Sequence, residues 1–402
     1  MGEMTTLAED FDAVVSRVGT FATKWDRMRT DFGTTDAIPM WVADMDFPAA
    51  PAIRAAVADR AAHPFYGYTT EPPDYRGVVA GWLARRSGWR PEADWIVHSN
   101  GVLPGIAFSL QAFTNPGDTV LAFEPSYPPF RRMTVGQGRE FLTVPLVPDD
   151  ATGSLRIDLD QVARVLASRP VKVCIMCSPH NPTGRVWTRE ELAALDELLA
   201  RHDVLVLSDE IHSDLIYPGH HHTPYPSVSE SAAARSVTFV APSKTFGTAG
   251  LQTAVVIIPN DEMRARFRDM EAAFGDTEMN PFGLASLIAA WTSCDSWVDD
   301  VMRYLEETRD FVLEELRRRI PAIRPIKPEG TYLLWLDCSK LGLGDPEMSE
   351  FFARVAGVAL TPGAPFGVTG TGHMRMNLAL PRPLVRQALD QIERAVASLP
   401  SR

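Results

Sequence analysis

The chain has 402 residues, and 39 Lys and Arg against 51 Asp and Glu leave it with a net charge of -12. Its length is sufficient for two ordinary domains, and 45% hydrophobic residues exclude a disordered protein. The acidic balance repels phosphate backbones and anionic lipids, so we expect no nucleic-acid partner and no membrane partner.

The cysteines and the N-terminus favour a cytoplasmic protein. Four cysteines are too few for the disulfide framework of a secreted scaffold. The first ten residues are acidic and lack the basic start and the apolar stretch of a secretory signal. No apolar run approaches the roughly 20 residues that a membrane-spanning helix needs. We therefore expect a soluble, cytoplasmic protein.

From about residue 50 to residue 295, helical patterns alternate with short runs rich in Val, Ile and Leu. This alternation is typical of an α/β fold in which helices cover both faces of a parallel sheet. We expect one helix over 101–113 and another after a capping box formed by Thr188 and Glu191. The expected strands cover 95–99, 119–123, 171–176, 203–208, 236–241 and 253–258.

The pattern changes after residue 295. We expect a long helix over 296–319, strands over 331–336 and 373–379 and a closing helix over 382–398. These elements predict a smaller α+β domain. The first 45 residues have no strong periodicity. We predict an N-terminal segment (1–48) that packs with the small domain or with a dimer partner, a large domain (49–295) and a small C-terminal domain (296–402).

Polar residues follow three of the predicted strands. Asp209 comes after the apolar run 204–207, Asn181 comes after 171–176, and Lys244 comes after 237–240. The ligand crevice of a parallel sheet lies at the carboxyl ends of its strands, so we expect these three side chains to converge. Taken singly, each also fits an ordinary surface or turn residue.

Together these residue types fit a pyridine cofactor that acts as an electron sink. Such a cofactor needs a lysine for its aldehyde and an acid for its ring nitrogen, because only the protonated ring withdraws electrons strongly. Lys244 and Asp209 can fill these roles. Tyr127 could cover the ring face, Asn181 could bond its hydroxyl, and a helix start at Gly101 could bind its phosphate.

Three motifs lie at the ends of predicted strands: 178–184 (SPHNPTG), 208–214 (SDEIHSD) and 241–246 (APSKTF). They resemble those of fold type I enzymes that use pyridoxal 5'-phosphate, in the class I/II aminotransferase family. From about residue 20 to the end, the chain is similar to the MalY/PatB group of carbon-sulfur β-lyases. The resemblance implies an aspartate aminotransferase-like α/β fold, with a mostly parallel sheet in the large domain and a smaller α+β C-terminal domain. The motifs that carry it are 40–47, 65–69, 218–219, 250–252, 327–332 and 374–379.

The resemblance also implies roles for individual residues. Lys244 would form a Schiff base with the cofactor and then act as the catalytic base, and Asp209 would pair with the ring nitrogen. Tyr127 would stack on the ring and Asn181 would face its hydroxyl. His212 stands where many aminotransferases have a tyrosine to the same hydroxyl, which leaves its role open.

The remaining roles concern the phosphate and the substrate. Gly101, Val102 and Ser243 would surround the phosphate, and Tyr68 would reach a phosphate in the other subunit of a homodimer. Arg375 would bind the substrate α-carboxylate as a bidentate partner, and Asn181 would also bind the substrate. The implied active sites are therefore shared between two subunits.

The resemblance implies elimination of a thiol from cystathionine or a related cysteine S-conjugate, which gives pyruvate and ammonia. Gln252 favours this lyase, since many aminotransferases have an Arg there. Asn100 replaces a usual Pro, and Gly247-Thr248 replaces a common Asn-Leu, which leaves substrate choice open. An aminotransferase and a cofactor-binding regulatory protein remain alternatives.

Three other patterns are interpreted as structural. Cys174 and Cys177 have metal-ligand spacing, but residues three apart in a strand face opposite sides. The histidines 220–222 are expected to be solvated in a loop, and the glycine-rich stretch 367–372 is expected to be a turn before Arg375. We predict no metal site.

Overall fold

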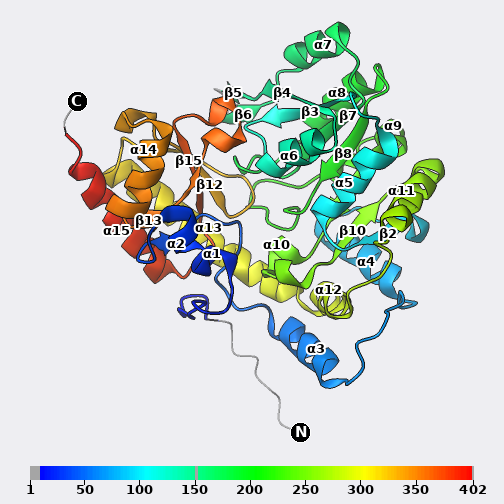
Figure 1. The fold of residues 1–402 in the computed structure, drawn as a ribbon, viewed down its shortest axis with the longest axis horizontal. Coiled ribbons are helices and arrows are strands. Elements are labelled where there is room, and N and C mark those ends of the chain that lie inside the picture. Colours follow the sequence, from blue (N-terminus) through cyan, green and yellow to red (C-terminus); the bar gives the residue numbers. More distant parts are fainter. Residues whose placement is uncertain (1–9, 150–152, 401–402) are drawn as a thin grey trace.

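The computed structural model describes residues 10–149 and 153–400, and a seven-stranded sheet is its largest element (Figure 1). Five neighbouring strands run parallel to one another in four pairs, and only the strand at 254–257 runs antiparallel to its neighbours on both sides. The mostly parallel α/β sheet is therefore confirmed. In spatial order the strands are β2 (Ile96–Ser99), β10 (Ala254–Ile257), β9 (Ser236–Val240), β8 (Leu205–Asp209), β7 (Val173–Cys177), β3 (Thr119–Glu124) and β4 (Glu140–Pro145).

All six predicted strands of this sheet are present, with ends that differ by at most two residues. The edge strand β4 was not predicted. Its first residue is exposed and most of the others are half-buried, so it has no continuous apolar run. A short hairpin of β5 (Val147–Asp149) and β6 (Ser154–Arg156) follows it.

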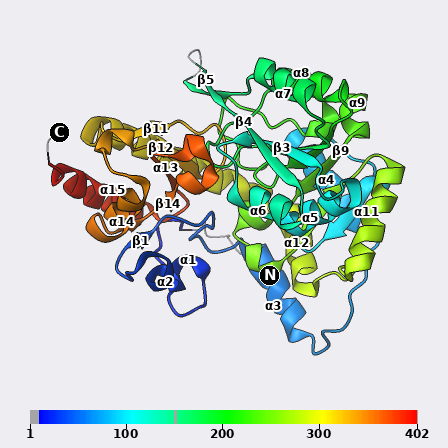
Figure 2. The same ribbon diagram turned by 45° about the horizontal axis from the view of Figure 1, so that its top comes forward.

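Helices cover both faces of the sheet, as Figures 1 and 2 show. One buried cluster joins strand residues to α7 (Leu159–Ser168) and α8 (Arg189–Ala200), and another joins the opposite face to α5 (Val102–Phe113) and α11 (Asp261–Phe274). The predicted helix and capping box are confirmed, since the Thr188 hydroxyl accepts from Glu191 N at 3.2 Å. The other helices of this part are α3 (Pro51–Ala62), α4 (Tyr75–Ser87), α6 (Pro128–Gly136), α9 (Glu230–Ala234), α10 (Ser243–Phe246) and α12 (Pro281–Ser293).

The C-terminal part contains a four-stranded antiparallel sheet in the order β11 (Arg324–Ile326), β12 (Leu333–Asp337), β15 (His373–Asn377) and β14 (Thr361–Pro362). The predicted long helix is α13 (Asp295–Arg319), and the closing helix is α15 (Arg382–Ala397). Between them α14 (Asp345–Glu350) continues into a π-helical turn (Phe351–Val355). No helix of the described residues is both long enough and apolar enough to cross a membrane.

The N-terminal segment, described from residue 10, packs against the C-terminal part. Its strand β1 (Ile38–Pro39) pairs in parallel with β13 (Val358–Ala359), after the short helices α1 (Thr23–Asp26) and α2 (Met28–Phe32). Phe11 contacts Trp297 and Tyr304 of α13, with ring centroids 5.8 and 5.5 Å apart. The domain boundaries at residues 48 and 295 stay predictions.

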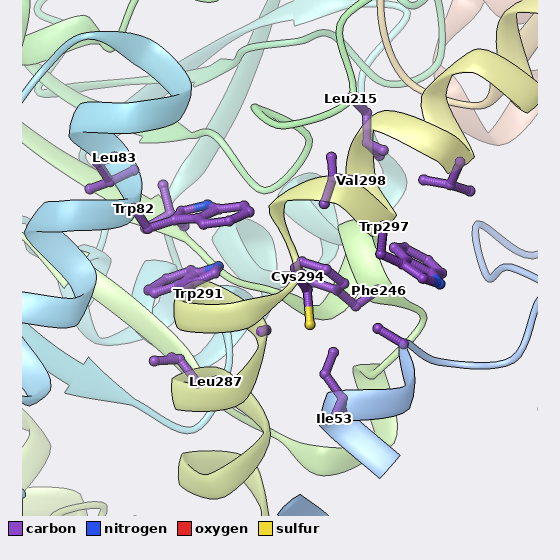
Figure 3. Close-up of a cluster of buried hydrophobic side chains, with 14 of the residues drawn as sticks. Ile53, Trp82, Leu83, Leu215, Phe246, Leu287, Trp291, Cys294, Trp297 and Val298 are labelled. Carbon is purple, nitrogen blue, oxygen red and sulfur yellow. The ribbon is translucent and has the colours of Figure 1, made fainter. Parts of the chain in front are cut away.

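A buried aromatic cluster anchors the short helix α10 (Figure 3). Trp82 of α4 stacks on Trp291 of α12 at 6.3 Å, and Phe246 of α10 lies 5.4 Å from Trp297 of α13. Phe246 is fully buried and stands two residues after Lys244. Because well-packed aromatic rings resist displacement, this cluster holds the backbone that carries Lys244.

Candidate active site

A cavity of about 230 Å³ lies where β7, β8 and β9 end, as the topology predicts. It brings together nearly all of the predicted cofactor-binding residues, which come from five separate segments of the chain. The predicted residues that line it are Gly101, Val102, Tyr127, Asn181, Asp209, His212, Ser243 and Lys244. Other lining residues, which sequence reasoning missed, include Ala43, Cys177, Ile211 and Thr253.

Lys244 is half-buried at this cavity, and its amine donates to the carbonyl of Ala43 at 2.8 Å. Burial lowers the pKa of Lys244, and the positive charge of Arg375 lowers it further, while Asp44 and Asp209 oppose the shift. A lysine with a lowered pKa has a larger neutral fraction. The arrangement therefore suits an amine that attacks a carbonyl or removes a proton.

Asp209 is the last residue of β8 and is buried in the same cavity. Burial raises the pKa of Asp209 to about 7, and the N–H of Ile211, which donates to its Oδ1 at 3.2 Å, opposes this shift together with Lys244. A cationic ring nitrogen beside the carboxyl would hold it ionised. This site therefore fits the pyridinium nitrogen of pyridoxal phosphate.

His212 also lines the cavity and is buried. Burial lowers the pKa of His212 to about 3, and the charges of Lys244 and Arg375 add to the effect, so the ring is neutral. Its Nδ1 has no hydrogen-bond partner among the described residues. A buried polar atom without a partner is unfavourable, and a polar group bound in the cavity would provide one.

The start of α5 forms the anion-binding end of the cavity. Gly101 precedes the helix without a side-chain cap, so the first N–H groups are available to a phosphate. Ser243 and Gln252 line the same cavity. Asn100, which replaces the family's usual proline, donates to Asp276 Oδ1 at 2.6 Å and to the Glu278 carbonyl at 3.1 Å. Asn100 thus ties this turn to the segment after α11.

Arg375 of β15 lies behind Asn181. Its Nη1 donates to Asn181 Oδ1 at 2.9 Å, and its Nη2 donates to the Trp41 carbonyl at 2.9 Å and to Thr361 Oγ1 at 3.2 Å. Burial lowers the pKa of Arg375 to about 10, which leaves it charged at neutral pH. No carboxylate of the described residues pairs with it, so this buried cation suits an incoming carboxylate.

Tyr68 is the one predicted cofactor-binding residue that does not line the cavity. It is 95% exposed, and it follows Phe65 and Tyr66, which are 73% and 59% exposed. The prediction assigns Tyr68 to the site of a partner subunit, and a single chain does not test it.

The structure also tests the three patterns that the sequence analysis interpreted as structural. Cys174 and Cys177 are buried on opposite faces of β7, as predicted, and the described residues contain no cluster that could hold a metal ion. The stretch 367–372 forms a turn that ends where β15 begins. The expectation of solvated histidines is wrong for His222, which is buried and pairs with Glu210 at 2.8 Å.

Comparisons with known proteins agree with the chemistry of this cavity. Residues 35–392 match the family described as Aminotransferase class I and II. The chain is 40% identical to the cystathionine beta-lyase PatB of Bacillus subtilis (strain 168), over 96% of this chain and all of that protein. It is 30% identical to the protein MalY of Escherichia coli (strain K12), over 97% of each chain. The crystal structure of cystalysin from Treponema denticola, which contains a pyridoxal 5'-phosphate cofactor, superposes with a TM-score of 0.94 at 31% identity, over 98% of this chain and all of that one.

Proposed function

Because the chain belongs to the aminotransferase class I and II family and, within it, to the MalY/PatB group of carbon-sulfur lyases, we propose a β-elimination for its active site. The protein is a pyridoxal 5'-phosphate-dependent enzyme with the aspartate aminotransferase-like fold. It cleaves cystathionine or a related cysteine S-conjugate, with one water, to pyruvate, ammonia and a thiol. The observation that carries this proposal is the meeting of half-buried Lys244 and buried Asp209 in one cavity, beside the buried Arg375.

When bound, pyridoxal phosphate supplies an aldehyde for the substrate amine and a ring that accepts electrons from Cα. Lys244 would hold this aldehyde in the resting enzyme, and its amine would later accept the Cα proton of the substrate. Asp209 would keep the ring nitrogen protonated, because an ionised carboxyl in a buried site favours a neighbouring cation. Tyr127 would cover one face of the ring, and Asn181 and His212 would meet its hydroxyl side; all three line the cavity.

Different residues would hold the phosphate and the substrate carboxylate. Gly101 and Val102 would offer backbone N–H groups to the phosphate, and Ser243 would add a hydroxyl. Arg375 would bind the α-carboxylate through its guanidinium, which Asn181 and Thr361 hold in place. Arg375 would thereby fix the carboxylate end of the substrate while Lys244 acts on its Cα proton.

We further propose a cytoplasmic homodimer in which Tyr68 reaches the phosphate of the partner's site. The strong exposure of Phe65, Tyr66 and Tyr68 supports this, because exposed aromatic groups mark interaction surfaces. The acidic composition supports a location free of membranes and nucleic acid.

An aminotransferase is the second candidate, because the matching family also contains aminotransferases. An assay with cystathionine distinguishes the two. We expect pyruvate to form without a keto acid acceptor, and Lys244→Ala to lose turnover together with the visible absorbance of the bound cofactor. The exposed Lys340→Ala serves as the control and should retain both.

A strict requirement for an acceptor would contradict the lyase and favour the aminotransferase. Cofactor binding without any turnover would instead favour a regulatory protein of the MalY type.

A further inference from the structure

A fully buried lysine lies close to the catalytic one. Lys24 of α1 is fully buried, with its Nζ 2.9 Å from Asp46 Oδ2 and 2.9 Å from the carbonyl of Asp44. A buried ammonium group is costly unless charged and polar partners compensate it, and these two oxygens do so. Nothing in the proposed reaction uses Lys24.

Arg17 binds the same loop from the solvent side. Its Nη2 lies 2.6 Å from Asp44 Oδ2, its Nη1 lies 2.7 Å from Asp46 Oδ1, and Nη1 also donates to the Met45 carbonyl at 3.0 Å. Arg17, Lys24, Asp44 and Asp46 together form what we call the N-terminal clasp. Two cations thus hold one short loop by both of its carboxylates.

The loop held by this clasp contacts the catalytic amine. The carbonyl of Ala43, adjacent to Asp44, accepts from Lys244 Nζ at 2.8 Å and from the Tyr332 hydroxyl at 3.2 Å. Asn377 Nδ2 donates to the Val42 and Asp44 carbonyls, both at 2.7 Å. The position of the Ala43 carbonyl therefore depends on the clasp on one side and on β15 on the other.

We propose that Arg17 and Lys24 are positioning residues for Lys244, which fix the Ala43 carbonyl at its amine and neutralise the Asp44 carboxylate beside it. The proposal rests on the proposed function only in taking Lys244 as the working amine. It assigns a role to the segment before residue 45, for which sequence periodicity indicated none.

The charges around Lys244 make this role measurable. Asp44 and Asp209 favour its ammonium form, Arg375 disfavours it, and burial lowers its pKa. The other titratable groups at the site are His212, which burial keeps neutral, and Cys177, Tyr127 and Tyr332, whose pKa values burial raises. Loss of the Arg17 charge would expose Lys244 to the full charge of Asp44 and raise the pKa of Lys244.

The test is a double-mutant cycle with Arg17→Gln, Asp44→Asn and the double variant. Labelling of the Lys244 amine by an acylating reagent, followed by mass spectrometry of the full chain without cofactor, gives the pH at which the amine becomes reactive. We expect Arg17→Gln to raise this pH by about one unit, Asp44→Asn to lower it, and the double variant to restore it. The control is Arg27→Gln, which removes an exposed ion pair with Asp31 in the same segment. This variant should leave the pH at which Lys244 becomes reactive unchanged.

Kinetics of the holoenzyme provide the second readout. The pH profile of kcat/KM should move in the same directions, and Lys24→Met should lower kcat about tenfold or more with a smaller change in KM. The proposal would be overturned if the variants lost kcat/KM equally at every pH and if the pH at which the Lys244 amine is labelled did not change. The clasp would then be a structural feature only. If labelling moves as expected but no pyruvate forms, the positioning role stands and the proposed reaction fails. Arg17 and Asp44 are 29% and 21% exposed, so their variants should fold even if Lys24→Met does not.

Discussion

Asp209 makes the stability of the cofactor-free chain depend on pH. Burial raises its pKa from 3.8 to about 7, so the folded chain binds this proton more tightly than the unfolded chain does. The contribution to stability is therefore complete below about pH 4 and declines as the pH rises through 7. The difference amounts to at most about 4 kcal/mol, at 1.36 kcal/mol for each pH unit.

Asp209→Asn should remove this dependence. We expect the cofactor-free variant to unfold at a higher temperature than the original chain at pH 8, and to lose this advantage at pH 4. Thermal unfolding monitored by circular dichroism across this range measures the effect. The control Asp94→Asn changes a carboxyl that is 90% exposed, and it should leave the unfolding temperature unchanged. A stability difference independent of pH would contradict the assigned pKa.

Sequence reasoning correctly identified those site residues that directly follow a predicted strand. Asp209, Asn181 and Lys244 were predicted to converge because each follows an apolar run, and they do line one cavity. His222 was mistaken for a solvated residue, because three adjacent histidines contain no pattern that shows which one turns inward. The clasp was missed for a related reason, since Arg17 and Lys24 meet their partners only through tertiary contacts.

At the scale of elements, the predictable strands were those with continuous burial. Four strands, β3, β7, β9 and β10, are buried along their whole length, and β8 is buried at all but its first residue. Each is rich in apolar residues. The two-residue strands β1, β13 and β14 are too short to show a period, and they exist only through pairing with distant segments. Local pattern thus predicts the central sheet but not the short strands around it.

The loop that follows β7 is joined to the segment before β12 at a glycine. Gly184 has φ +71°, and a Cβ there would lie 2.4 Å from Pro328 Cβ and 2.8 Å from the Gly330 carbonyl oxygen. The Gly184 carbonyl also accepts from the N–H groups of Glu329 and Gly330, both at 2.9 Å. This junction holds the loop that carries Asn181.

We expect Gly184→Ala to lower the free energy of unfolding by about 3 kcal/mol or more, because it adds a steric clash to backbone strain. Gly219→Ala is the matched control, since Gly219 has φ +91° and no atom within 4 Å of its Cβ position. Gly219→Ala should lower the free energy of unfolding by only about 1 kcal/mol, because it adds backbone strain without a clash. Denaturant unfolding of both variants measures the difference, and equal losses would show that the junction can relax.

At the scale of the whole molecule, the proposed shared sites predict complementation. Lys244→Ala and Tyr68→Ala should each be nearly inactive alone, but a mixed dimer has one site with both residues intact. Co-refolding of equal amounts should restore about a quarter of the original activity. Lys244→Ala mixed with Asp209→Asn should restore none, because both of these residues act in their own subunit. No recovery in the first mixture would exclude a contribution of Tyr68 across the interface.

The pairing of β1 with β13 also constrains when the catalytic amine acquires its neighbours during synthesis. Ile38 pairs with Val358, so the two partners of this bridge are far apart in the chain. The N-terminal segment can make this pairing only after residue 358 has been synthesised, well after Lys244 itself. The contact between the Ala43 carbonyl and the Lys244 amine therefore depends on a segment that docks late.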